Sequence, residues 1–498
     1  MIEFQNSTVG AKVLAIGDGT MLSALVKALF ESGLKEVHEM STNSESSNAN
    51  FIDWSDKIRL FDWILYVNQR MNLEDIHTIH NACGEESKPL LIATCLGQTG
   101  FMVPSVYPNS GGGWESAWRR IHRSAIEDDP MLPTMSFSAE AMLINVLVFE
   151  LNRAITSESS AESGWTPQLY RMNLQTLEGA YHTYMPHPLV TKGFGIELIP
   201  DWNQRLGREH NIRFDPERFL SFIGQLTSPY FGILHLWEEG NLKQLPLSQC
   251  RVQPIDPLSE GPVELLPAVI SSGLTHREAR KLAGLAGIEA HAARLGHGHV
   301  DFPDSAEVGA GQSIEETVFR GLEKCLTQQL RKRTLDRIPI VQAVQITRVE
   351  DDRCRYYLQA LTTMQGAPSI GSGEDLFGLP VVWVGAGERW HGCVGLNRTL
   401  ALRSALTLAL MMAQNPTELP MPQGIHVETV DLLEGDPTRM TIDAIDDTAQ
   451  AEQIQLALQV LNRNRKSVSV YKLSIEPFVN EHLGGLFGIR LGEAGTTN

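Results

Sequence analysis

A glycine-flanked turn near the start of the chain, Gly17-Asp18-Gly19-Thr20, has the residue types that could bind a phosphate. It follows an apolar run over residues 12–16 and precedes leucines and a valine at helical spacing. In strand–turn–helix units of this kind, backbone N–H groups at the helix N-terminus can face a phosphate. Gly17 and Gly19 are therefore the candidate cofactor-binding residues. The pair lacks the third glycine of the dinucleotide fingerprint, so it equally fits a tight turn that holds no ligand.

The acidic residue that would hold a ribose is missing from the second predicted strand. Nucleotide-binding domains of this class usually place a carboxylate at the end of that strand. Here the strand over residues 37–40 continues into Ser41-Thr42-Asn43-Ser44, and Glu39 falls inside it. We therefore predict no catalytic residue and no tightly bound cofactor, with ATP as the remaining alternative.

Three histidines, His291, His297 and His299, are the candidate metal ligands. Imidazole suits zinc and other transition metals. No further ligand recurs at a fixed spacing beside them, and the six cysteines include no CxxC pair. Structural zinc sites usually need such paired ligands. The sequence therefore predicts no metal site and scattered, reduced cysteines.

The overall charge and hydropathy exclude several classes of partner. The net charge is −18 and the pI is near 5.3. Nucleic acids and anionic membranes attract the opposite charge, so we expect neither as a partner. No apolar stretch reaches the length of a membrane span, and the N-terminus has no secretory signal pattern. These features favour a cytoplasmic protein.

Strands alternate with helices through the first half. The expected strands cover residues 12–16, 37–40, 63–67 and 89–94, and the expected helices cover 22–29 and 73–82. Residues 139–150 are apolar nearly all round, which is typical of a buried helix. This alternation predicts a mainly parallel sheet covered on both faces.

The second half contains three helices with clear start signals. Thr275, Ser313 and Asn397 are expected N-caps, and Glu278 and Glu316 complete capping boxes. Small residues recur along one face of each helix, which predicts close packing rather than a ligand site. The expected strands cover 340–346, 381–384 and 390–394. A polar segment over residues 201–217 reads as the connection between two domains.

The whole chain resembles the ThiF-like maturation proteins of thiazole- and oxazole-containing bacteriocins. These are the F proteins that accompany YcaO azoline cyclodehydratases. The resemblance runs in one order through both halves. It is carried by Lys12–Leu34, Thr176–Val190, Gly273–His291, Val308–Leu326, Asp351–Gly371 and Gly378–Leu406.

This resemblance implies a fold and a role. The implied fold class is α/β, with a Rossmann-like ThiF-type domain over residues 1–200 and a degenerate, α+β YcaO-like domain over 201–498. The implied role is to recruit a ribosomally made precursor peptide to a catalytic YcaO cyclodehydratase. That partner uses ATP to convert Cys, Ser or Thr side chains into azoline rings. Relatives carry a peptide clamp before the ThiF-like half, so we expect that another chain supplies a separate clamp domain, that this chain docks the peptide differently, or that it has lost this role.

The chain departs from the catalytic members at the residues that would hold Mg-ATP. The resemblance places Ala286 and Lys324 where catalytic members have glutamates, and leaves Glu289 and perhaps Glu323. Magnesium needs oxygen ligands, which neither an alanine nor a lysine side chain supplies.

The hypothesis is therefore a non-catalytic accessory protein of thiazole- and oxazole-modified bacteriocin biosynthesis. The alternative is that the chain is itself an ATP-dependent cyclodehydratase or an adenylating enzyme. A nicotinamide oxidoreductase is a third reading, which depends on the glycine turn alone.

Overall fold

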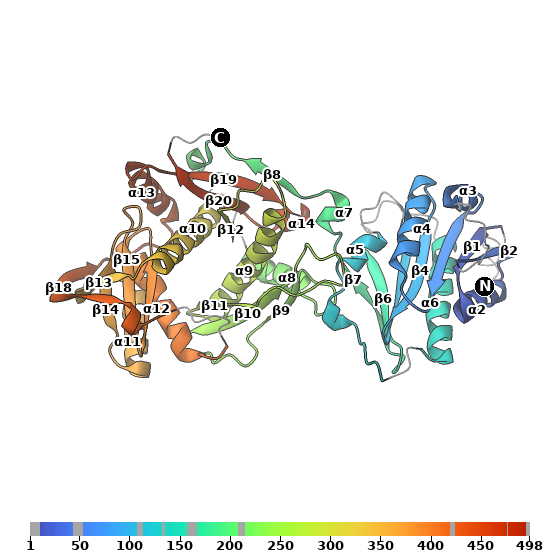
Figure 1. The fold of residues 1–498 in the computed structure, drawn as a ribbon, viewed down its shortest axis with the longest axis horizontal. Helices are drawn as coiled ribbons and strands as arrows, with labels where there is room; N and C mark the ends of the chain where they lie inside the picture. Colours follow the sequence, from blue (N-terminus) through green and yellow to red (C-terminus); the bar gives the residue numbers. More distant parts are fainter. Residues whose placement is uncertain are drawn as a thin grey trace. The chain divides into compact units, whose positions relative to one another are not determined.

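The computed structural model describes residues 10–42, 53–106, 113–131, 135–156, 167–207, 215–418, 424–475 and 477–494. These residues form two compact units (Figure 1). The first contains the chain up to residue 192 together with the short segments 229–232 and 259–264, and the second contains the rest. The sequence-based boundary at residue 200 lies close to this division. Nothing in the sequence pattern marked the two short segments that return to the first unit.

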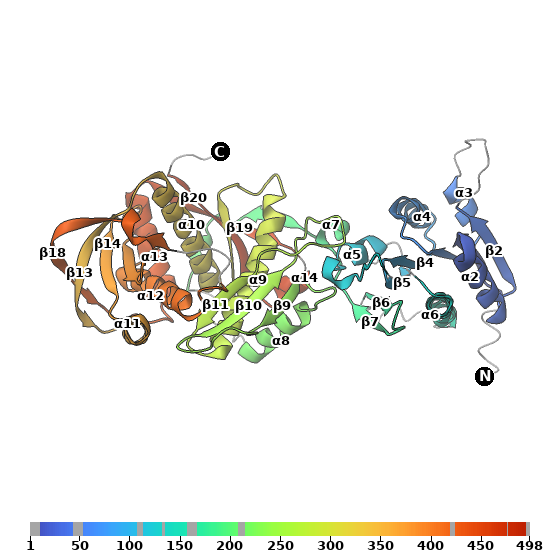
Figure 2. The ribbon, with the colours of Figure 1, turned by 60° about the horizontal axis from the view of Figure 1, so that its bottom comes forward.

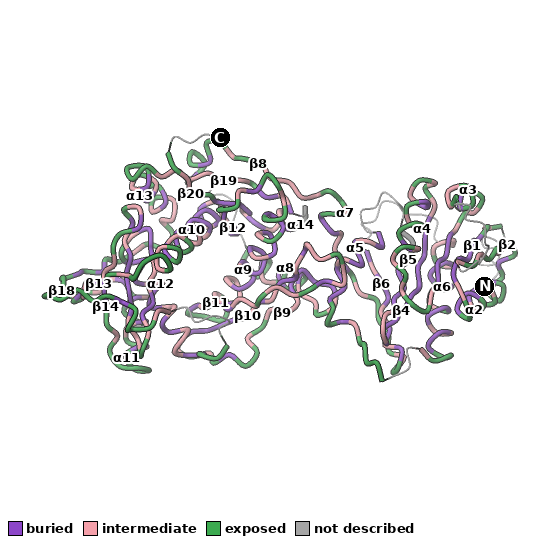
Figure 3. Tube along the Cα trace, viewed as in Figure 1, coloured by how far each residue is buried: buried purple, intermediate pink, exposed green. Residues whose placement is uncertain are grey.

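The first unit is built on a sheet with the strand order β2-β1-β3-β4-β5-β6-β7 (Figure 2). Its strands are β1 Lys12–Gly17, β2 Glu36–Ser41, β3 Trp63–Asn68, β4 Leu90–Leu96, β5 Thr99–Val106, β6 Gln168–Asn173 and β7 Gly179–Thr183. The first four pair in parallel, in the 2-1-3-4 order of a doubly wound sheet. β1, β3 and β4 are almost wholly buried (Figure 3), as expected for strands covered on both faces.

The last three strands correct the expectation of a mainly parallel sheet. β4 to β7 follow one another as antiparallel neighbours. Residues 97–100 are the tight turn and the first residues of a hairpin between β4 and β5. The expected α/β class is confirmed, whereas the identity of this unit as a ThiF-type domain stays a prediction.

Helices cover both faces of this sheet. They are α2 Gly19–Glu31, α3 Trp54–Ile58, α4 Leu73–Glu85, α5 Trp114–Trp118, α6 Phe137–Thr156 and the short α7 Pro188–Thr191, with a 3-10 turn at Arg123–Ala125. α6 packs Leu143, Leu147 and Leu151 into the core shared with α2. The expectation that residues 139–150 are buried all round is wrong, because Asn145 is exposed and Phe149 is 62% exposed.

The second unit contains three sheets, with the strand orders β11-β10-β9, β12-β20-β19-β8 and β17-β16-β15-β14-β13-β18. Its strands are β8 Gly195–Leu198, β9 Leu234–Glu238, β10 Ser248–Pro254, β11 Val269–Gly273, β12 Ala306–Gly311, β13 Ile340–Val349, β14 Ser369–Gly373, β15 Val381–Ala386, β16 Arg389–Val394, β17 Ile425–His426, β18 Asp431–Ile442, β19 Lys466–Ser474 and β20 Gly485–Glu493. The helices are α8 Pro216–Leu226, α9 His276–His297, α10 Ile314–Asp336, α11 Asp352–Gln365, α12 Arg398–Gln414, α13 Gln450–Arg463 and α14 Pro477–Glu481, with 3-10 turns at Trp202–Gln204 and Val427–Thr429.

The three predicted helix starts are confirmed. The side chains of Thr275, Ser313 and Asn397 accept hydrogen bonds from the N–H groups of the first turns of α9, α10 and α12. The predicted strands at 340–346, 381–384 and 390–394 lie within β13, β15 and β16, and the last two form a hairpin. These signals were readable because caps and hairpins depend on residues that are close in sequence.

The segment 201–217 is more than a polar connection. β8, just before it, pairs with β19 near the other end of the chain. Trp202 is buried in the main core of the second unit, and its indole N–H donates to the carbonyl of Val468. The sequence analysis did not predict the burial of Trp202, because the segment around it is mostly polar.

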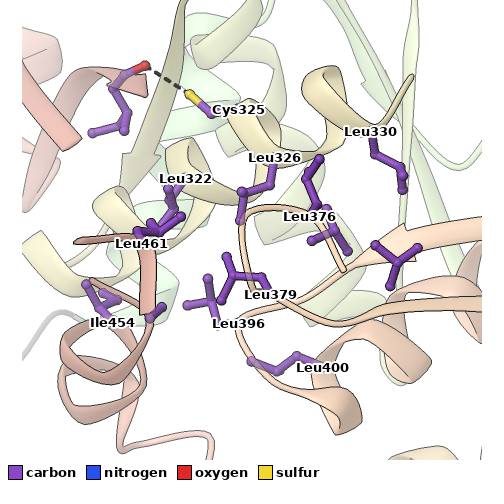
Figure 4. Close-up of a cluster of buried hydrophobic side chains, with 14 of the residues drawn as sticks. Leu322, Cys325, Leu326, Leu330, Leu376, Leu379, Leu396, Leu400, Ile454 and Leu461 are labelled. Atoms are coloured by element: carbon purple, nitrogen blue, oxygen red, sulfur yellow. Dashed lines mark hydrogen bonds between the residues drawn. The ribbon is translucent and has the colours of Figure 1, made fainter. Parts of the chain in front are cut away.

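Helix α10 lies at the centre of that core. Leu322, Leu326 and Leu330 on α10 pack against Leu376 and Leu379 (Figure 4). The Cys325 thiol donates to the carbonyl of Ile489 on β20 at 3.0 Å. α10 also approaches β12 and β20 closely at Gly321, where an added Cβ would lie 2.3 Å from Cγ1 of Ile489. The stripe of small residues predicted on this helix therefore serves packing.

We predict that Gly321→Val destabilises the second unit by about 2 kcal/mol or more, since overpacking a dense core commonly costs ~1–3 kcal/mol. Gln328→Val, at an exposed position of the same helix, is the matched control. Urea unfolding measures both variants. Equal midpoints for the two would show that α10 does not need close approach at residue 321.

Candidate functional site

The glycine turn lies at the carboxyl end of β1, in the first unit. Gly17 is the last residue of β1, and a Cβ at this position would lie 2.1 Å from the backbone oxygen of Val67 on β3. Gly19 begins α2 with φ +65°, a conformation that favours glycine. Close strand approach and turn geometry thus account for both glycines. Their role in holding a cofactor stays a prediction.

Asp18 lies between the two glycines, and its carboxylate bonds to residues at the end of the neighbouring strand β2. It accepts hydrogen bonds from the hydroxyls of Ser41, at 2.5 Å, and of Thr42, both at the end of β2. These are the positions after the second strand where a carboxylate would otherwise hold a ribose. The turn therefore ties its own two strands together through side chains.

Two further carboxylates lie near the same edge. Glu140 on α6 accepts from the Thr20 hydroxyl at 2.8 Å and from the Gln69 amide at 2.9 Å. Burial, and then the negative charge of Asp18, raises the pKa of Asp75. Because like charges repel strongly in a partly buried site, this edge disfavours a phosphate. The electrostatics add to the sequence argument against tight nucleotide binding.

The resemblance singled out four positions of the second unit in connection with Mg-ATP ligands, which are Ala286, Glu289, Glu323 and Lys324. Among the three charged residues of this set, Glu289 is the most deeply buried. It lies on α9, and its side chain is fully buried. Arg320 on α10 donates two bonds to it, at 2.6 Å and 2.7 Å, in a bidentate pair. Lys324, one turn later, donates at 2.7 Å, and the N–H of Ala310 on β12 donates at 2.9 Å. We call Glu289, Arg320, Lys324 and Ala310 the Glu289 cluster.

The cluster keeps Glu289 ionised. Burial alone would raise the pKa of its carboxyl, but the charges of Arg320 and Lys324, together with their hydrogen bonds, hold the pKa below its usual value. Both carboxylate oxygens accept two bonds each, from donors on α10 and β12. A divalent cation would have to displace Arg320 and the N–H of Ala310 to reach Oε1, and both Arg320 and Lys324 to reach Oε2.

The other two residues that the resemblance singled out, Ala286 and Glu323, are not members of the Glu289 cluster. Ala286 is half-buried on α9, three residues before Glu289, and offers no ligand. Glu323 is half-buried on α10, and burial raises the pKa of its carboxyl to about 7. Its charge raises the pKa of the Cys393 thiol on β16, after burial as the main cause. The charges of Arg320 and Glu289 also act on the pKa of Glu323.

The three histidines do not converge on one point. His291 is buried and contacts the carbonyl of Ile255, whereas His297 contacts the carbonyl of Ala293 one turn earlier. His299 contacts the N–H of Asp301 and the ring of Phe194. Within the described ranges, no group of three or more His, Cys, Asp or Glu side chains is arranged to hold a metal ion. No helix in the same ranges is both long and apolar enough to cross a membrane.

Arg320 is the functional candidate that the sequence analysis missed. A readable signal existed, because Arg320 and Lys324 are four residues apart and therefore share one face of α10. Two cations on a buried helix face require an acidic partner. The partner could not be chosen from the sequence, since the neighbourhood of α9 and α10 depends on tertiary packing, in which both helices contact β12.

The fold resembles solved heterocyclases over nearly its whole length. A heterocyclase in complex with substrate and cofactor aligns with 99% of this chain and 82% of its own, at a TM-score of 0.63 and 12% identity. The heterocyclase TruD aligns with 99% of this chain and 80% of its own, at a TM-score of 0.56 and 12% identity. Escherichia coli MccB aligns with 38% of this chain and 68% of its own at 14% identity, with a TM-score of only 0.28.

Sequence comparison adds no family. No family model matches the chain, and no curated protein matches it significantly. At 12% identity the two heterocyclase likenesses establish the fold alone. The chain therefore has the heterocyclase fold, which confirms the YcaO-like part of the expected architecture, while the F-protein role stays a prediction.

We predict that Glu289→Gln destabilises the protein by about 3 kcal/mol, because removing one partner of a buried ion pair leaves buried charge uncompensated. Glu374→Gln removes a carboxylate from an exposed pair with Arg337 and should change stability by less than about 0.5 kcal/mol. Urea unfolding at neutral pH compares the two variants. A similar small loss for both would mean that the Glu289 cluster contributes little.

The same cluster predicts a pH dependence. The folded-state pKa of Glu289 is held below its usual value of 4.5, so its stabilising effect is present above that pH and is lost as pH falls through the folded-state pKa. The difference in unfolding free energy between wild type and Glu289→Gln should therefore be constant near neutral pH and shrink in acid. Urea melts in steps from pH 7 to pH 3 measure it; a difference that grew in acid would contradict the assignment.

Proposed function

We propose that this chain is a non-catalytic accessory protein in the maturation of a ribosomally made peptide that carries azoline rings. It acts together with a separate, catalytic heterocyclase of the YcaO type. The heterocyclase fold supports this setting, and the resemblance in sequence to ThiF-like maturation proteins supports the accessory role.

The observation that carries the proposal is the Glu289 cluster. Glu289 is one of the retained acidic residues. Its two carboxylate oxygens are both occupied, one by Arg320 and a backbone N–H and the other by Arg320 and Lys324. The position expected to hold a second glutamate supplies one of those cations. Two side-chain cations therefore stand where Mg²⁺ would need free oxygen ligands. A domain arranged in this way keeps the shape of a heterocyclase without the ligands for its metal–nucleotide complex.

The alternative is that this chain is itself an ATP-dependent heterocyclase. The likeness in fold favours this alternative over the accessory role, because the aligned proteins are heterocyclases and one of them was solved with substrate and cofactor. On this reading, ATP would bind through residues other than Glu289. Glu323, with its pKa near 7 and no cationic hydrogen-bond partner among the described contacts, is the acidic group that would be free to do so.

An accessory protein can accelerate the reaction without any reacting group. Holding the precursor peptide close to the partner's active site raises its local concentration. Such binding is equal in the ground state and the transition state, so it lowers the apparent KM and leaves kcat nearly unchanged.

The test is a reconstituted reaction with Mg-ATP, the precursor peptide and the heterocyclase from the same gene neighbourhood. We predict that adding this chain lowers the apparent KM for the peptide at least about tenfold, with little change in kcat. Loss of one water per ring, followed by mass spectrometry, measures ring formation.

Two controls separate the readings. If the chain alone, with Mg-ATP and peptide, formed rings, the accessory role would be wrong and the enzyme alternative correct. Glu323→Gln should then abolish that activity, whereas under the accessory role it leaves the effect on KM intact. An unchanged KM in the complete mixture would exclude recruitment.

A further inference from the structure

Within the part of the chain that the structure describes, one edge of the sheet in the first unit lacks the usual protection against pairing with another strand. β2 and β7 are the two edge strands among the described residues. β2 carries Glu36 and Glu39, and charged side chains on an edge oppose the addition of a further strand. β7 has the sequence Gly-Ala-Tyr-His-Thr, without a lysine, arginine, aspartate, glutamate or proline, and its residues are mostly exposed. Of the two edges, β2 is therefore protected by charged side chains, whereas β7 is open to the addition of a further strand.

The ladder between β6 and β7 fixes which backbone groups of β7 point outward. The N–H of Asn173 donates to the carbonyl of Glu178, and the N–H of Tyr184 donates to the carbonyl of Pro167. Opposed residues alternate in an antiparallel pair, so the even-numbered residues bond to β6. The N–H and C=O groups of Gly179, Tyr181 and Thr183 therefore point away from the sheet.

An apolar groove lies beside this edge. It has a volume of about 660 Å³ and is formed by the outer face of α6 and the side chain of Tyr181. Phe137 and Phe149 lie near its two ends, and the helix rise of ~1.5 Å per residue separates them by about 18 Å. The side chain of Tyr181 forms one side of the groove. Its position is fixed, because its hydroxyl donates to Glu150 at 2.5 Å and its ring contacts Tyr170.

We propose that β7 and this groove form a docking site for one extended peptide segment of another chain, which adds as a strand to β7. The outward backbone groups select an extended chain, and alternate side chains of that chain enter the groove. A strand of five or six residues spans about 18 Å at ~3.3 Å per residue, which matches both the groove and the five residues of β7.

The preferred segment has apolar residues at alternate positions and few acidic ones. Exposed Glu178 lies at the start of β7, and the chain carries a net charge of −18, so a neutral or basic segment is complementary. The proposed function suggests a precursor peptide as the biological source. The site itself follows from the edge and the groove, so it stands or fails independently of that function.

The experiment selects peptides from a displayed library of random dodecapeptides against the full chain, without ATP or a heterocyclase. Thr183→Pro removes one outward N–H and no bond to β6, whereas the matched variant Thr183→Ala keeps that N–H. Circular dichroism and thermal unfolding establish that both variants are folded. Phe149→Lys, at an exposed end of the groove, tests the apolar contact.

The expected result is enrichment of peptides with apolar residues at alternate positions. Synthetic copies should bind Thr183→Pro and Phe149→Lys at least about tenfold more weakly than wild type, and bind Thr183→Ala as wild type does. Failure to enrich, or equal binding to Thr183→Pro, would overturn the proposal. A wild-type dimer in sedimentation that Thr183→Pro converts to a monomer would overturn it too, because a second copy would then occupy the edge.

Discussion

The second unit depends on one buried carboxylate that stays charged. Glu289 joins α9 to α10 through Arg320 and Lys324, and to β12 through the N–H of Ala310. A charge without solvent is costly unless its partners satisfy every lone pair, and here the bidentate arginine, the lysine and the amide do so. This one group thereby links two long helices and the strand β12, on which both helices pack.

This constraint has a functional consequence. Carboxylates on neighbouring helices that face one another repel, and a divalent cation can relieve that repulsion. In this chain the compensating charge is built into α10 as Arg320 and Lys324. The charge of Glu289 is therefore balanced by side chains of the domain itself.

The sequence predicted local features well and long-range ones poorly. The starts of α9, α10 and α12 were correct because Thr275, Ser313 and Asn397 act within their own helices. The antiparallel strands β5 to β7 were missed, since their pairing depends on partners outside any short window. Residues 139–150 of α6 were predicted to be buried from their composition alone, and the exposure of Phe149 became visible only once the neighbouring strands were placed.

The candidate sites follow the same division. The turn at Gly17 and Gly19 was predicted from its spacing in the sequence. The hydrogen bonds of Asp18 to Ser41 and Thr42 could not be predicted, because they depend on where β2 lies. The alignment implied by the family resemblance, through Ala286 and Lys324, directed attention to α9 and α10. The bidentate pair of Arg320 with Glu289 could not be predicted, because it depends on how the two helices pack.

Isothermal titration of Mg-ATP into the full chain tests the central claim most directly, namely that the Glu289 cluster replaces a metal–nucleotide complex. The account predicts no saturable heat up to millimolar nucleotide, with the same result when Mg²⁺ is omitted. Saturable, Mg²⁺-dependent binding in the micromolar range would contradict it.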